Sequence, residues 1–78
     1  MCLAVPGLLT AIDGKVGVLD FQGSQLRVSL AMVPEAKVGA WLLVHAGMAL
    51  QEVDAVEARK TWAYLEEMGV AELPEQLK

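Results

Sequence analysis

The chain has a single cysteine, Cys2, and a single histidine, His45. One thiol excludes an internal disulfide, and one thiol with one imidazole falls short of the four protein ligands of a structural metal site. Neither crosslink that stabilises many small secreted domains is therefore available. A reducing compartment fits this composition best, so we expect a cytoplasmic protein.

Basic residues are also few. Six Lys and Arg residues stand against ten Asp and Glu residues, which gives a formal net charge of -4. The basic residues are scattered along the chain, and aromatic residues make up only 5% of it. Proteins that bind nucleic acid need basic grooves and aromatic stacking platforms, so we expect no nucleic-acid partner.

Long hydrophobic runs are absent. The most apolar stretch, AWLLVHAGMAL, is broken by His45 and Gly47 and falls short of the roughly 18 apolar residues of a spanning helix. The apolar N-terminal stretch has no Lys or Arg before it, so we expect neither a membrane span nor an export signal. Hydrophobic residues still make up 55% of the 78 residues. A chain this small cannot bury them all, which predicts exposed apolar surface for a protein partner.

Short segments of alternating polarity, separated by turn residues, predict a mainly β fold. The turn pairs are Asp13-Gly14 and Gln22-Gly23, and Pro34 and Gly39 bracket a longer loop. The expected strands are 8–12, 15–21, 24–32, 41–46 and 49–53. So many short antiparallel strands in so little space favour a small closed or nearly closed barrel.

Two of these strands carry specific expectations. In the strand 24–32, the residues at every second position are predicted to form one buried face: Leu26, Val28, Leu30 and Met32. The strand 41–46 is apolar on both faces, which predicts that it is covered on both sides.

The periodicity changes at Asp54, which can cap a helix with Glu57 in the capping-box position. The helical stripe predicted to face the barrel is Ala55, Ala58, Trp62 and Leu65. Gly69 is a helix stop, and the segment after it is expected to be a loose tail. We therefore expect one domain over 1–78, with a barrel over 1–54, a C-terminal helix over 55–69 and a tail over 70–78.

Cys2 is a candidate reactive residue because of its position. If Met1 is removed, the thiol lies beside the α-ammonium group, which favours the thiolate form that binds metal. The alternative is a small residue with no chemical role. Pro6-Gly7 is interpreted as a turn that ends the N-terminal segment.

His45 is the other candidate. Strand alternation places it on the same face as Trp41 and Leu43. It can act as a metal ligand, as a proton acceptor for Cys2 or as a donor to a bound anion, or its ring can simply bond a backbone carbonyl. One thiolate and one imidazole cannot enclose a metal, so a metal held here keeps other ligands. Such a site suits transfer better than storage.

Two blocks of the sequence resemble the HypC/HupF/HybG family of hydrogenase maturation chaperones. The opening MCLAVPG is similar to the N-terminal signature of that family, and VGAWLLVHAGMAL is similar to its second block. The stretches LRVSLAMV and EARKTWAYLEEM also stand where the family has a strand and a helix. Ala40 and Met48 depart from the usual family residues, which bears on the choice of partner.

The resemblance implies an OB-like antiparallel β-barrel with a C-terminal α-helix, and a chaperone rather than an enzyme. It implies that the chain carries iron as Fe(CN)2(CO), shared with a HypD-type iron-sulfur protein, and delivers it to the precursor of the [NiFe]-hydrogenase large subunit. Cys2 and His45 would bind the iron. The residues implied for partner binding are Cys2, Leu3, Ala4, Val5, Pro6 and Gly7.

Three other functions fit parts of the sequence. The chain could be a non-catalytic adaptor in which Cys2 has no role, and unchanged function after Cys2→Ser would indicate this. It could be an OB-like nucleic-acid binder, which the charge balance opposes. It could also be a thiol enzyme with His45 as the base for Cys2, although no third residue that would orient the base is evident.

Overall fold

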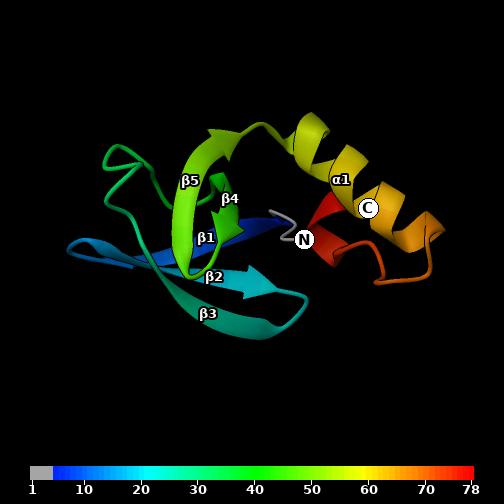
Figure 1. Cartoon of the computed structure of the whole chain (residues 1–78), viewed down its shortest axis with the longest axis horizontal. Coiled ribbons are helices and arrows are strands. Elements are labelled where there is room, and N and C mark those ends of the chain that lie inside the picture. Colours follow the sequence, from blue (N-terminus) through cyan, green and yellow to red (C-terminus); the bar gives the residue numbers. More distant parts are fainter. Residues whose placement is uncertain (1–4) are drawn as a thin grey trace.

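The computed structural model describes residues 5–78 and shows a mainly β protein with one C-terminal α-helix, as predicted (Figure 1). Cys2, Leu3 and Ala4 lie outside the described residues. The elements are β1 (Val5–Asp13), β2 (Val16–Phe21), β3 (Ser24–Ser29), β4 (Trp41–His45), β5 (Met48–Val53), α1 (Ala55–Glu67) and a short 3-10 helix (Glu75–Leu77).

The five strands form a closed barrel of OB-like type in the order β1-β2-β3-β5-β4. All neighbouring strands are antiparallel except β3 and β5, which run parallel and pair only at Ser29 and Met48. The small antiparallel barrel that the sequence predicts is thus confirmed, and it contains this one parallel junction. In the loop from β3 to β4, Val33, Ala36 and Ala40 pack against the barrel core.

The two hairpins that begin the barrel turn at glycines. Asp13 pairs with Val16, so the first turn consists of Gly14 and Lys15, one residue later than predicted. Gly14 has φ 62 and supplies the positive φ that such a turn needs. The second turn, Gln22-Gly23, is as predicted, with φ 55 and φ 92.

The core has two parts. Inside the barrel, the buried cluster consists of Leu9, Leu19, Val28, Leu30, Leu42, Val44 and Ala49. Between the outer wall and α1, a second cluster consists of Trp41, Ala58, Trp62, Leu65 and Leu77. Strand β4 contributes to both clusters, which confirms that it is covered on both faces.

The predicted buried face of the third strand is only half correct. Val28 and Leu30 are buried, whereas Leu26 is 44% exposed and Met32 is 61% exposed. The strand ends at Ser29, so strand alternation does not govern Met32. Leu26 is exposed because β3 has lost its second neighbour at that point.

Helix α1 begins at Ala55, as the sequence predicts, and ends at Glu67, two residues before the predicted end. The carboxylate of Asp54 accepts a hydrogen bond from the backbone N–H of Glu57 at 2.7 Å. At the other end Gly69 has φ 78, and the N–H of Val70 returns to the carbonyl of Leu65. Ala58, Trp62 and Leu65 are buried as predicted, but Ala55 is exposed because it lies in the first turn, beyond the barrel wall.

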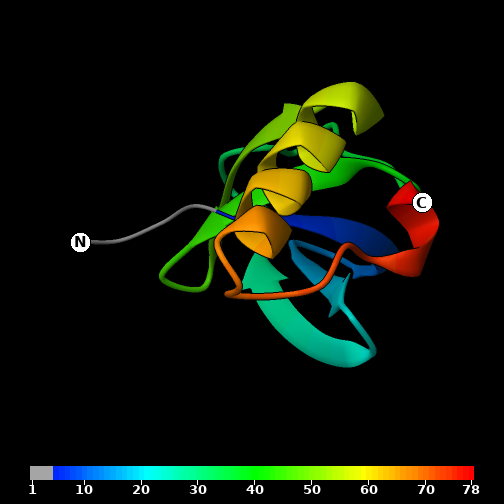
Figure 2. The same cartoon turned by 90° about the vertical axis from the view of Figure 1, so that its right-hand side faces the viewer.

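The expectation of a loose tail after Gly69 is wrong. Leu77 is only 6% exposed, its carbonyl accepts from Arg59, and the Gln76 amide donates to Asp20 at 2.8 Å. Figure 2 shows this segment, orange to red, returning from the end of α1 toward the barrel. Its leucines supply enough apolar area to fix it against α1.

Candidate functional site

The N-terminal motif forms the first part of β1. Val5 pairs with Val44, Pro6 with Leu43 and Gly7 with Leu42 of β4. The interpretation of Pro6-Gly7 as a turn is therefore wrong. Pairing of β1 with β2 starts only at Leu8. Pro6 thus stands where the strand has one neighbour, which tolerates its missing N–H.

Helix α1 holds this strand from outside the barrel. The indole Nε1 of Trp62 donates a buried hydrogen bond of 2.8 Å to the carbonyl oxygen of Pro6. The sequence predicts Trp62 only as a buried apolar residue, and this bond was missed. The signal was available, because a buried indole N–H nearly always has a partner.

Gly7 is required by close packing rather than by its backbone angles. A Cβ atom at this position would lie 2.6 Å from Cζ of Phe21. The ring of Phe21 therefore occupies the space that a side chain at position 7 would need. Together, β4, Trp62 and Phe21 fix the base of the N-terminal segment in the barrel.

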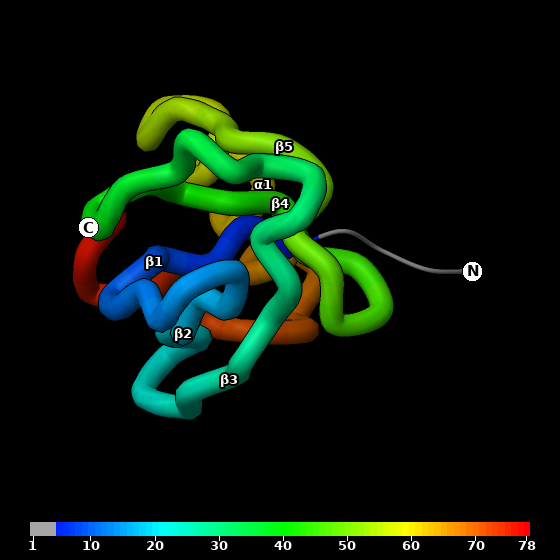
Figure 3. Tube along the Cα trace, turned by 90° about the vertical axis from the view of Figure 1, so that its left-hand side faces the viewer, coloured from blue at the N-terminus to red at the C-terminus, as the bar shows by residue number. Residues whose placement is uncertain are grey.

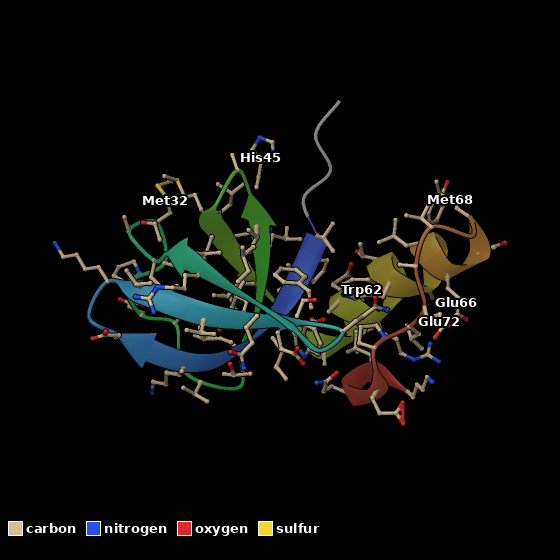
Figure 4. All side chains as sticks on the ribbon, turned by 90° about the horizontal axis from the view of Figure 1, so that it is seen from below. Met32, His45, Trp62, Glu66, Met68 and Glu72 are labelled. Atoms are coloured by element: carbon tan, nitrogen blue, oxygen red, sulfur yellow. The ribbon has the colours of Figure 1, made fainter. Side chains whose placement is uncertain are left out.

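His45 is the last residue of β4, directly before the turn that leads to β5. Leu42 and Val44 point into the barrel core, so alternation leaves His45 on the outer face with Trp41, as predicted. Figure 4 shows His45 at the tip of the β4–β5 hairpin.

The imidazole of His45 is available for binding. The ring is half-buried, no hydrogen bond within residues 5–78 involves it, and none of its nitrogens is both buried and unpartnered. Its nitrogens therefore reach the surface. The alternative of a histidine bonded to a backbone carbonyl is not found in the described part of the chain.

The turn after His45 is strained. Both of its central residues have positive φ, 53 at Ala46 and 76 at Gly47, and His45 pairs with Met48 across it. Positive φ is ordinary for glycine but costs an alanine about 1–2 kcal/mol. Strain of this kind concentrates at functional sites, where the rest of the structure maintains it.

The start of β1 lies beside the end of β4 that carries His45. Val5 pairs with Val44, the residue directly before His45. Cys2 stands three positions before Val5 in the sequence and lies outside the described residues, so its approach to His45 stays a prediction.

Residues 5–78 alone do not form a metal centre, because they contain no group of three or more His, Cys, Asp or Glu residues that could hold a metal. Any metal bound at His45 needs ligands from elsewhere, such as Cys2, the metal's own small ligands or a partner protein. The roles of Cys2 and His45 in binding iron stay predictions.

Comparison with known proteins decides the family. The family model described as the HupF/HypC family matches residues 1–65 of the chain. The chain belongs to the HupF/HypC family. The resemblance in the two sequence blocks is thereby confirmed, and the structure shows that the second block forms β4, the strained turn and the start of β5.

Curated HupF/HypC relatives match along most of their length. The chain is 41% identical over 76 residues to the hydrogenase maturation factor HypC of Synechocystis, covering 90% of this chain and 100% of the relative. It is 38% identical over 74 residues to the protein of the same name from Escherichia coli K12, covering 87% and 82%. For Cupriavidus necator HypC the identity is 35% over 75 residues, covering 95% and 83%. Within residues 5–78, no helix is long and apolar enough to cross a membrane.

Proposed function

We propose that this HupF/HypC-family chain is a hydrogenase maturation chaperone that carries Fe(CN)2(CO) with a HypD-type iron-sulfur partner. It delivers this group to the precursor of the [NiFe]-hydrogenase large subunit. The curated relatives named as hydrogenase maturation factors support the general role. The specific role in carrying iron is supported by the accessible imidazole of His45, which follows the residue paired with Val5 of β1. The only cysteine stands three positions before Val5 in the sequence.

The donor set suits this cargo. An iron that already holds cyanide and carbon monoxide has few positions left for protein, and a soft thiolate is an appropriate donor for it. Cys2 ligates the iron, and His45 assists as a second ligand or as a hydrogen-bond donor to a bound cyanide. Because the protein supplies so few ligands, a partner cysteine can displace them, and the chain acts as a carrier without turnover of its own.

The fixed first residues of β1 support the transfer of iron to a partner. Pro6 is anchored by Trp62 and Gly7 is packed under Phe21, so the first residues of β1 are fixed in the barrel. In the proposed complex, residues 2–4 bind in extended form in a groove of a partner and carry the thiol into it. The partner then completes the coordination of the iron.

The test is iron retention after anaerobic purification of the chain with its HypD-type partner. The wild-type complex is expected to hold iron with cyanide and carbonyl infrared bands, and Cys2→Ala to lose them while the fold is kept. His45→Ala is expected to lower the iron content, and Gln51→Ala, an exposed residue of β5, serves as the matched control. Unchanged bands in the Cys2→Ala complex contradict the proposal.

A non-catalytic adaptor is the second candidate, and the surface of α1 favours it. On α1, Val56 and Tyr64 are 63% and 65% exposed, and Met68, the residue that caps its C-terminal end, is 57% exposed. Exposed apolar side chains of this size often mark a surface that binds another protein. An adaptor requires this surface but not the thiol. Hydrogenase maturation that continues at the normal rate in Cys2→Ser, and stops in a Tyr64→Glu variant, would favour the adaptor over the iron carrier.

A further inference from the structure

Strand β3 has one edge with almost no neighbour. Its first edge pairs with β2 along its whole length, from Ser24 to Ser29. Its second edge meets β5 only where Ser29 pairs with Met48. Figure 3 shows β3 running away from β5 toward its turn with β2. Within residues 5–78, the second edge from Ser24 to Val28 therefore has no paired strand.

The backbone groups on this edge face outward from the ladder. The N–H of Ser29 donates to the carbonyl of Gly47 at 3.0 Å, so it points to the β5 side. In a strand the backbone N–H and C=O groups alternate between the two edges. The groups of Gln25 and Arg27 thus point to the same side, where no described strand receives them. They form a template for one more strand.

The barrel is closed between β3 and β5 only by the pair of Ser29 with Met48, and the exposure of Leu26 follows from this. Leu26 is on the inward face of β3, two residues from the buried Val28 and opposite Leu19, which is 0% exposed. Leu26 is nevertheless 44% exposed. An inward leucine in contact with solvent indicates a place where an added strand would bury apolar area.

We propose that the edge Ser24–Val28, which we call the free β3 edge, binds an extended segment of the metal-free large-subunit precursor as an added strand. The proposal rests on the proposed function. It goes further by naming the receiving surface and the conformation of the client.

Two observations and one general property of metal sites favour this occupant. The free β3 edge is followed by Ser29, which bonds Gly47 in the turn that carries His45, so a strand paired at this edge leads toward the proposed iron site. Metal binding is coupled to folding of the residues that hold the metal, so we expect the metal-free precursor to offer extended chain at its empty site. Arg27 is exposed and forms no ion pair within residues 5–78, which favours an acidic residue on the incoming strand.

Amide hydrogen exchange of the full chain tests the pairing directly. In the free protein the N–H groups of Gln25 and Arg27 are expected to exchange rapidly, while those of Leu26 and Val28, which bond β2, are protected. On addition of the metal-free precursor, exchange at Gln25 and Arg27 should slow by about tenfold or more. The amide of Gln51, on β5, should stay unchanged.

Two substitutions of Arg27 distinguish the contribution of its backbone N–H to precursor binding from the contribution of its charge. Arg27→Pro removes the outward N–H and leaves the β2 pairing intact, so precursor affinity should fall by about tenfold. Arg27→Thr keeps the N–H and removes only the charge, so it should weaken binding by about threefold. Both variants should bind the HypD-type partner as the wild type does.

The outcomes are distinct. A precursor complex that leaves Gln25 and Arg27 exchanging as in the free protein overturns this inference and leaves the proposed function standing. Protection that rises with the concentration of the free protein shows a second copy on the edge and also overturns it. If the precursor does not bind at all, both the inference and the proposed delivery step are wrong.

Discussion

Trp62 donates its indole N–H to the carbonyl oxygen of Pro6 at 2.8 Å, and this bond joins the middle of α1 to the first strand of the barrel. Residues 56 positions apart in the sequence are thus held together in a buried environment. The bond explains why a C-terminal helix belongs to a protein whose proposed chemistry is at the other end of the chain. The helix fixes the first residues of β1, which follow Cys2 in the sequence.

Trp62→Phe should therefore destabilise the protein. Phenylalanine preserves most of the apolar packing but leaves the Pro6 carbonyl buried without a donor, at a cost of about 1–3 kcal/mol. Urea denaturation followed by circular dichroism measures the loss. Tyr64→Phe, at a position that is 65% exposed, is the control and should change stability by less than about 0.5 kcal/mol. Equal stability of the two variants would show that the bond has no energetic role.

Gly7→Ala should destabilise the barrel by steric overlap. The new methyl group would lie 2.6 Å from Cζ of Phe21, and overpacking of this size costs about 1–3 kcal/mol. Phe21→Leu in the same chain should restore part of the loss because the ring that causes the overlap is removed. A double-mutant cycle with thermal unfolding measures the coupling. Additive effects of the two substitutions would contradict this explanation.

Ala46→Asn should raise stability. Ala46 has φ 53, a conformation that asparagine adopts more readily than alanine, so the gain is about 0.5–1 kcal/mol. Ala46→Val should lower stability, because a β-branched residue resists positive φ still more. The melting temperatures of both variants test the sign. A lower melting temperature for Ala46→Asn would mean that the turn is not strained.

Leu77→Ala should cost about 2 kcal/mol, because a side chain that is 6% exposed would leave a cavity between the tail and α1. Val70→Ala is the matched control, since Val70 is 64% exposed in the same segment. Guanidinium denaturation of the two variants separates an attached tail from a loose one. Identical denaturation midpoints for the two variants would show that the segment after Gly69 is a loose tail.

The sequence predicts the elements of this fold well where local patterns decide them. The turn at Gln22-Gly23, the cap at Asp54 and the stop at Gly69 follow from the conformations that these residue types prefer. The parallel junction of β3 with β5 is set by closure of the barrel, which no local pattern records. Leu26 was wrongly assigned to the core for that reason.

The candidate site was predicted in part. The position of His45 on the outer face follows from strand alternation, and its place beside Val5 needs the pairing of β1 with β4. The bond from Trp62 to Pro6 and the fit of Gly7 under Phe21 join residues that are far apart in sequence. Contacts of that kind appear only once the chain is folded. The role of Cys2 stays a prediction that the family resemblance implies and that composition alone leaves undecided.

In the proposed function, the thiol of Cys2 is a ligand of the iron. Iron-edge X-ray absorption of the loaded chain, isolated after transfer from its HypD-type partner, detects such a ligand. A sulfur scatterer at bonding distance is expected in the wild type, and its replacement by a lighter atom, or loss of iron, is expected in Cys2→Ser. The same sulfur shell and the same iron content in both proteins would contradict it.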